Sequence, residues 1–334
     1  MVLASLLGLS ACSAVPADSW LISPIEYDNA MDGQATARTD VTYAMHHLSD
    51  DTAGGLWTES SGSWLHLDEN GDTLSRFNDD LLFTVHGISA VTPTVLAVSR
   101  TRRGEIGGAD SGLFLFDTGS RSWEKLEVAA SSIGDVVVAD DGRIVFVEFL
   151  EPAAEHRRPS DPSRGYAIRS IDAAGRLATL LAPETVLAAS VVEIDVDPNG
   201  TVFLSTERET LRVEPDGAVT TLLTYPVQMP VLSVSPAGDV ISRRPADAGA
   251  AEPVWRTDGG SEEARGIIHA RADCAGSTTG ELAVTTAGVS TALPFSCGSN
   301  GVAWITDASF VLSIGDESGT VLGRITSPSG VVTP

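Results

Sequence analysis

Short runs of β-branched and other apolar residues alternate with glycine turns along most of the chain. The segment 191–223, VVEIDVDPNGTVFLSTERETLRVEPDGAVTTLL, has such runs before, between and after the turns Pro198-Asn199-Gly200 and Pro215-Asp216-Gly217. Runs of four to eight residues bounded by Gly, Pro, Asn and Asp are typical of β-strands joined by tight turns. The pattern therefore predicts strands in close succession and no extended helical segment.

Two kinds of turn recur in register. Turns of the Asp-x-x-Gly type, flanked by strands, lie 42 to 59 residues apart at Gly71, Gly119, Gly175, Gly217, Gly260 and Gly319. A second glycine turn, as in DDGRIVFVE and SNGVAWITD, lies upstream of most of them. A period of about 40 to 50 residues with four strands is typical of a propeller blade.

We therefore predict an all-β, six-bladed β-propeller over residues 43–330. Seven blades are the alternative count, because the last unit carries an extra strand's worth of sequence around GELAVTTAGV. Two β-sandwiches also use short strands and glycine turns, but they do not repeat two distinct turns in register. Residues 13–42 fall outside the units, and we expect a linker there that can add a closing strand to the last blade.

The pattern EIDVDPNGTVFLS…LRVEPDG resembles NHL and SMP-30-like six-bladed propellers, over most of the chain and at low motif specificity. The chain departs from the NHL pattern at Ser205-Thr206, where an Asp is usual. The resemblance to SMP-30-like lactonases implies a divalent metal at the mouth of the central channel. Their ligands are carboxylates and asparagine, however, and this chain does not reproduce that set.

Polar residues recur at one position of the predicted innermost strands. Counting back seven residues from each turn gives His47, His86, Asp135 and Glu193 in four consecutive units. Imidazole and carboxylate groups that converge near a channel mouth can hold Zn²⁺ or Mn²⁺ with an open position for water. The alternative is that they are ordinary polar residues at the wet end of a channel. No Gly-x-Ser-x-Gly, phosphate-binding glycine loop or His-Glu-x-x-His occurs in the sequence.

The charge of the chain limits its partners. The formal net charge is −24, which disfavours nucleic acid because phosphate binding needs clustered positive charge. The long connections between second and third strands nevertheless contain or adjoin eight arginines, Arg100, Arg102, Arg103, Arg157, Arg158, Arg164, Arg243 and Arg244. We expect either a face that binds an anionic partner or arginines that pair with neighbouring Asp and Glu side chains.

The N-terminal residues 1–12, MVLASLLGLSAC, resemble the end of a bacterial lipoprotein signal peptide. Leu9-Ser10-Ala11-Cys12 matches a lipobox, whose cysteine becomes the lipidated first residue, although no Lys or Arg precedes the apolar run. The resemblance implies export and lipid anchoring of Cys12 to the outer face of the bacterial cytoplasmic membrane. An ordinary buried segment with a chance cysteine is the alternative.

The other two cysteines are Cys274 and Cys297. The segment between them reads as a hairpin around residues 285–288, which brings the two cysteines nearly opposite each other. An exported protein would oxidise such a pair, and closing this loop would stabilise the fold by roughly 3 kcal/mol. We predict a disulfide.

Taken together, these features predict an exported, lipid-anchored, monomeric propeller without a cofactor. Its expected role is to bind or scaffold an envelope protein or an anionic envelope ligand. The alternative is a metal-dependent lactonase or related hydrolase with one divalent ion held by His47, His86, Asp135 and Glu193.

Overall fold

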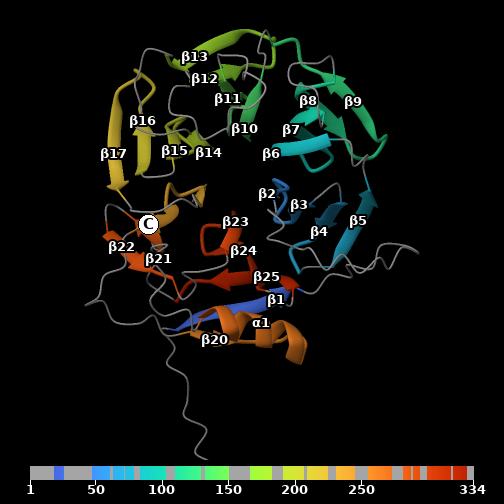
Figure 1. Cartoon of the computed structure of the whole chain (residues 1–334), viewed down its shortest axis with the longest axis vertical. Helices are drawn as coiled ribbons and strands as arrows, with labels where there is room; N and C mark the ends of the chain where they lie inside the picture. Colours follow the sequence, from blue (N-terminus) through green and yellow to red (C-terminus); the bar gives the residue numbers. More distant parts are fainter. Residues whose placement is uncertain are drawn as a thin grey trace, which may run out of the picture.

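The computed structural model is a six-bladed β-propeller, with six sheets arranged around a central axis (Figure 1). This confirms the predicted fold class and the count of six blades. The structure describes residues 19–25, 47–60, 63–70, 72–78, 83–102, 110–128, 132–149, 166–182, 191–206, 209–224, 231–244, 255–272, 281–286, 289–293, 299–316 and 319–328.

Four blades are built from consecutive strands, from the channel outward: β2 (His47–Asp50), β3 (Leu56–Ser60), β4 (Ser63–Leu67) and β5 (Thr73–Asn78); β6 (Phe83–Thr92), β7 (Val95–Arg102), β8 (Gly112–Asp117) and β9 (Ser122–Lys125); β10 (Ile133–Val138), β11 (Ile144–Phe149), β12 (Tyr166–Ile171) and β13 (Leu177–Leu181); β14 (Val191–Val196), β15 (Val202–Thr206), β16 (Glu209–Val213) and β17 (Val219–Thr224). Their neighbouring strands pair antiparallel, as the turn pattern predicts.

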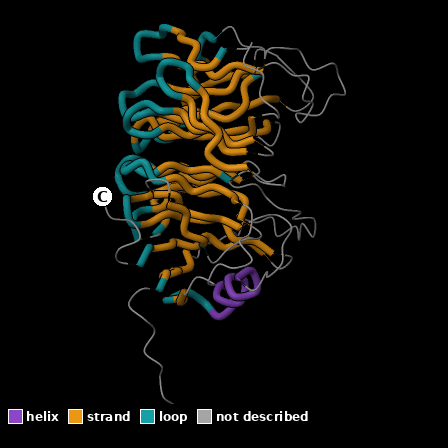
Figure 2. The backbone as a smooth tube through the Cα atoms, turned by 90° about the vertical axis from the view of Figure 1, so that its left-hand side faces the viewer, coloured by secondary structure: helices purple, strands orange, loops and turns teal. Residues whose placement is uncertain are grey.

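The aspartates of the repeated turns explain why the motif recurs. The Asp197 side chain accepts hydrogen bonds from the backbone N–H of Asn199 (2.9 Å) and Thr201 (2.8 Å). Gly200 follows with φ +83°, a conformation that glycine adopts without steric cost. A short polar side chain that satisfies the turn amides thus joins each pair of strands tightly. The described turns gather along one side of the ring (Figure 2).

The fifth blade differs from the sequence prediction. It contains β18 (Leu232–Val234), β19 (Val240–Arg244), β21 (Glu281–Thr286) and β22 (Val289–Ala292). Gly260 is therefore not a blade turn. The segment around it forms β20 (Trp255–Thr257) and α1 (Glu262–Ala272), inserted between β19 and β21. The hairpin expected around residues 285–288 is confirmed by the pairing of β21 with β22.

The sixth blade contains β23 (Ser299–Thr306), β24 (Ser309–Asp316) and β25 (Gly319–Thr326), and the N-terminal strand β1 (Trp20–Ile25) pairs antiparallel with β25. The prediction of a turn at Gly301 is wrong, because this glycine lies within β23 where the register shifts between Ser299 and Val302. The hairpin at Gly319 joins the second and third strands, not the third and fourth. A strand from residues 13–42 therefore completes the last blade.

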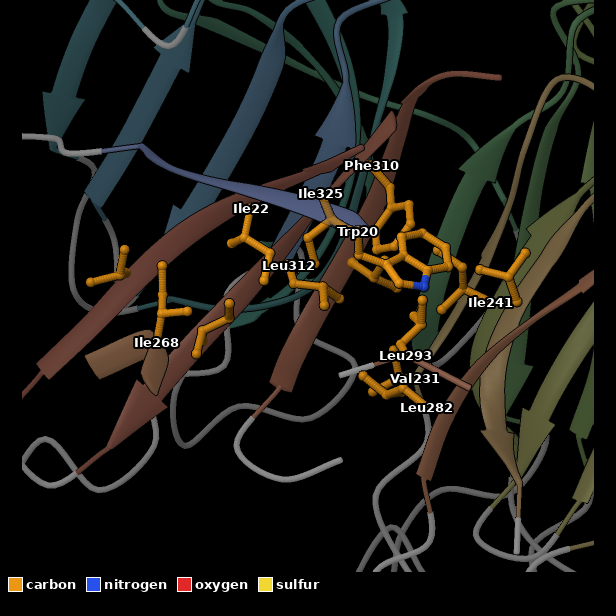
Figure 3. Close-up of a cluster of buried hydrophobic side chains, with 14 of the residues drawn as sticks. Trp20, Ile22, Val231, Ile241, Ile268, Leu282, Leu293, Phe310, Leu312 and Ile325 are labelled. Carbon is orange, nitrogen blue, oxygen red and sulfur yellow. The ribbon is translucent and has the colours of Figure 1, made fainter. Parts of the chain in front are cut away.

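The insertion covers the outer edge of the sixth blade. β20 adds to β1 in parallel as a fifth strand, and α1 packs against β24 and β25. Trp20, Ile22, Ile268 and Phe310 contribute to the buried apolar cluster there, shown in Figure 3. The innermost strands contact one another in the cyclic order β2, β6, β10, β14, β18 and β23, and β23 contacts β2. The ring is therefore closed around a channel.

Candidate functional site

A cavity of about 210 Å³ lies on the axis of the ring, and residues of all six innermost strands line it. His47, His86, Asp135 and Glu193 all line this cavity. The sequence register thus identified four side chains from four consecutive blades that the fold brings to one place. Each lies at or near the start of its strand. They therefore lie away from the tight turns that follow the innermost strands.

Irregular pairing turns three of these side chains toward the channel. The register shifts between Val85 and Gly87 in β6, between Ile133 and Val136 in β10, and between Val191 and Glu193 in β14. A bulge of this kind inserts an unpaired residue and redirects its side chain. His86 and Asp135 are the residues at the first two shifts, so their placement depends on bulges rather than on regular alternation.

His86 is exposed to the channel, and its Nε2 lies 3.0 Å from Oγ1 of Thr101. The surrounding protein lowers the pKa of His86, because removal of water disfavours the charged ring. This histidine is therefore largely neutral near pH 7, with a ring nitrogen available for a polar ligand.

The carboxyl of Asp135 is bonded to the backbone of two strands. Its Oδ1 accepts a hydrogen bond from Val136 N (2.9 Å), and its Oδ2 accepts one from Ile194 N of the next blade (2.9 Å). Burial raises the pKa of Asp135 to about 7, although the two amides oppose that shift. Asp135 therefore joins two blades as well as lining the cavity.

Asp195, which the sequence analysis did not select, is placed in the same way one blade further on. Its Oδ1 accepts from Val196 N (2.8 Å) and its Oδ2 accepts from Val234 N (2.6 Å), and burial raises its pKa to about 7. Ser49 and Ser89 make the corresponding contacts to Ala90 N and Val138 N. A signal was present, since Ser49 and Asp195 both lie five residues before a turn glycine, Gly54 and Gly200.

Glu193 is the carboxyl with a free acceptor. The backbone amide of Leu232 donates to this carboxyl, whereas Oε2 is buried and has no hydrogen-bond partner among the described residues. Burial and the neighbouring Asp135 raise the pKa of Glu193 well above its ordinary value. The Leu232 amide and Arg243 act in the opposite direction.

The predicted metal ligands share the cavity but are not arranged as a metal site. Within the described ranges, no group of three or more His, Cys, Asp and Glu side chains is placed to hold a metal ion. One reason is that both oxygens of Asp135 accept backbone hydrogen bonds. The residues present therefore do not fit a bound divalent ion in the geometry that the structure shows.

The arginines of the predicted partner face are mostly not exposed where they are described. Arg243 is 1% exposed, and Arg100 is 8% exposed with its guanidinium 3.8 Å from the centre of the Trp123 ring. Both lie in the interior, which differs from the exposed placement that the sequence predicts. Arg102 is exposed and pairs with Asp110 at 3.1 Å. Arg103, Arg157, Arg158, Arg164 and the side chain of Arg244 lie outside the described residues.

The three cysteines, Cys12, Cys274 and Cys297, also lie outside the described residues, so the lipid anchor and the disulfide stay predictions. Within the part of the chain that is described, no helix is long and apolar enough to cross a membrane.

No protein-family model and no curated protein matches the sequence. The fold is similar to that of a gluconolactonase from Xanthomonas campestris, with 15% identity, a TM-score of 0.52 and coverage of 86% of this chain and 87% of that chain. It is also similar to an auxiliary nutrient binding protein from Bacteroides thetaiotaomicron, with 9% identity, a TM-score of 0.52 and coverage of 85% and 69%. At these identities the likeness concerns the fold alone, and it agrees with the lactonase-type propeller that the sequence resembles.

Proposed function

We propose that this protein is a binding propeller that holds a small polar ligand in its central cavity. The observation that supports this proposal is the convergence of His47, His86, Asp135 and Glu193, from four blades, on one cavity. A concave site with a few polar groups among apolar walls is the usual form of a small-molecule site. The similarity to a nutrient binding propeller is compatible with this function.

The ligand would contact side chains that still have hydrogen-bonding capacity. His86 presents a neutral ring, and Glu193 keeps a buried oxygen without a described partner. Asp135 and Asp195 already bond to backbone amides and would mainly hold the blades in place. Binding therefore needs no rearrangement of the ring.

Hydrolysis by a metal-dependent lactonase mechanism is the second candidate. The similarity to a gluconolactonase fold and the pairing of two histidines with carboxyls in one cavity favour it. His47, His86, Asp135 and Glu193 would hold the ion, and the ion would supply an activated water. This function requires the four side chains to approach one another more closely than they do in the structure.

Histidine NMR tests the binding proposal directly. The chain has six histidines, and His47 and His86 can be assigned from His→Gln variants. We expect a ligand from a panel of neutral sugars, lactones and amines to shift both resonances saturably. His66, buried in the first blade at 2.8 Å from Asp51, should not shift. A panel that leaves His47 and His86 unchanged would argue against the proposal. Lactone hydrolysis that depends on added metal would favour the second candidate.

Anchoring at the envelope is a separate part of the proposal. The support for it is the lipobox-like sequence that ends at Cys12. We expect metabolic labelling with palmitate to mark the full chain and not the Cys12→Ser variant. An envelope partner for the arginine-bearing connections should be recovered with the lipid-free chain, and less of it with Arg102→Glu, Arg103→Glu, Arg157→Glu and Arg158→Glu combined.

A further inference from the structure

Carboxyl groups line the central cavity, and lysine and arginine do not. Among the described residues that line it, the charged or titratable side chains are Asp50, His47, His86, Asp135, Asp140, Glu193 and Asp195. A cavity with five carboxyls and no permanent cation disfavours phosphates and carboxylates as ligands. The net charge of −24 adds a field that attracts cations from solution.

One of these carboxyls lacks a donor. Oε2 of Glu193 is buried and unbonded within the described part of the chain, although Leu232 N donates to the same carboxyl. A buried acceptor without a partner costs about 1–3 kcal/mol. A ligand that brings a charged N–H group to this oxygen would remove that cost and form a charge-assisted hydrogen bond.

The same cavity does not suit a bare metal ion. Divalent ions need several ligands at about 2.0–2.6 Å, and the described His, Cys, Asp and Glu residues provide no group of three in reach of one ion. Apolar side chains make up much of the remaining wall, including Val136, Ile194, Leu232 and Trp304. Such a wall contacts an alkyl or aromatic group.

We propose that the ligand of the central cavity is an organic cation, an ammonium compound whose charged group meets Glu193 and whose apolar body contacts Ile194, Leu232 and Trp304. This inference rests on the proposed function, ligand binding in this cavity, and adds the chemical class of the ligand. Arg243 lies near Glu193 without lining the cavity, so it weakens the negative potential there but leaves the carboxyl accessible to the ligand.

The test compares a cation with a neutral molecule of the same shape. Phenethylammonium and 2-phenylethanol are titrated separately into the whole protein, and the resonances of His47 and His86 are followed. We expect saturable shifts with phenethylammonium and at least tenfold weaker binding of 2-phenylethanol. Because the pKa of Glu193 is raised, an ammonium group displaces a proton, and its affinity should increase from pH 6 to pH 8.

Two variants locate the charge. Glu193→Gln keeps the shape of the side chain and should weaken phenethylammonium binding at least tenfold. Glu124→Gln removes the same charge from the exposed outer strand β9 and should leave the affinity unchanged. Circular dichroism of both variants establishes that they fold.

The outcomes separate this inference from the proposed function. If 2-phenylethanol or neutral sugars bind at His47 and His86 as well as the cation, the cavity is a ligand site but the cationic class is wrong. If Ca²⁺ or Mn²⁺ binds instead, and Glu193→Gln abolishes that binding, a metal ion replaces the organic cation. If no probe shifts His47 or His86, both the inference and the proposed function fail.

Discussion

The carboxylate oxygen Oδ2 of Asp135 on β10 accepts a hydrogen bond from the backbone N–H of Ile194 on β14, at 2.9 Å across the boundary between two blades. Asp195 makes the equivalent contact to Val234 across the next boundary. Side chains that line the cavity thus also join neighbouring blades. Ligand binding and the geometry of the ring are therefore physically connected at this site.

Raising the pH should destabilise the ring through these two carboxyls. Burial raises the pKa of Asp135 and of Asp195 from 3.8 to about 7, so the folded state binds their protons more tightly than the unfolded chain does. The resulting stabilisation is complete below about pH 3.8 and is lost as the pH rises through about 7. We expect the free energy of unfolding in urea to fall between pH 5 and pH 8, by at most about 1.4 kcal/mol per pH unit and carboxyl.

Two substitutions identify the source of this pH dependence. Asp135→Asn keeps a carbonyl that accepts from Ile194 but has no proton to release, so the dependence should become less steep. Asp216→Asn, in the exposed turn between β16 and β17, should leave it unchanged. A free energy of unfolding that rises from pH 5 to pH 8 in the wild-type chain would contradict the proposed role of these carboxyls.

Gly87→Ala should displace Asp135 and destabilise the protein. A Cβ at this position would overlap Oδ1 of Asp135 and crowd the backbone nitrogen of Val136 at 2.8 Å. Forcing a methyl group into such a packed boundary typically costs about 1–3 kcal/mol. The free energy of unfolding in urea measures the cost, and ligand titration of His86 measures the effect on the cavity.

Gly266→Ala is the matched control for that substitution. Gly266 lies exposed in α1, and an added Cβ would meet nothing within 4 Å. Alanine is favoured over glycine in a helix by about 0.8–1 kcal/mol, so this variant should be slightly more stable. Equal effects of the two substitutions would mean that β6 and β10 do not approach as closely as the structure shows.

The sequence predicts the four regular blades because each of their turns carries its own local instruction. Asp172 and Asp197 accept hydrogen bonds from the turn amides, and the glycines that follow them adopt positive φ. These interactions lie within five residues of sequence. The turn pattern is therefore sufficient to place such strands without knowledge of the rest of the fold.

The last two blades were misassigned where a glycine or an apolar residue serves another purpose. Gly301 lies at a bulge in β23, and glycine at a bulge cannot be distinguished from glycine in a turn by composition. α1 was read as part of a strand, although Ser261 precedes it and accepts a hydrogen bond from Ala264 N at 3.1 Å. That serine is an N-cap signal, and it would have indicated a helix.

The site was predicted in part because strand register repeats while side-chain contacts do not. Counting from turns located His47 and Glu193 in one cavity. It could not show that Asp135 bonds to Ile194, since this contact joins residues 59 positions apart. It also could not show that Arg100 packs against aromatic rings in the interior. Such contacts depend on the neighbouring strand or blade, whose position no local pattern contains.

Asp51→Ala should destabilise the first blade more than the equivalent change elsewhere. Asp51 is 3% exposed, and it accepts from Gly55 N at 2.7 Å while its other oxygen meets His66 Nε2 at 2.8 Å. The His66 ring in turn stacks on Trp57, with 4.2 Å between ring centres. Removing the carboxylate leaves buried donors unsatisfied, which we expect to cost about 2–4 kcal/mol in total.

Asp197→Ala is the comparison, because Asp197 makes the same pair of turn hydrogen bonds. We expect this variant to lose about 1 kcal/mol, measured as the free energy of unfolding in urea. The difference between the two variants estimates the contribution of the buried pair with His66. If the two losses are equal, the contact between Asp51 and His66 adds nothing to stability.

Trp20→Ala should show that the N-terminal strand holds the last blade together. Trp20 is 3% exposed on β1, beside Phe310 of β24, with 6.2 Å between ring centres (Figure 3). Replacing a buried tryptophan by alanine typically costs about 3–5 kcal/mol. Trp255→Ala, on the neighbouring edge strand β20 and only partly buried, should cost less. Urea unfolding measures both, and a loss below about 1 kcal/mol for Trp20→Ala would mean that the ring does not depend on β1 for its closure.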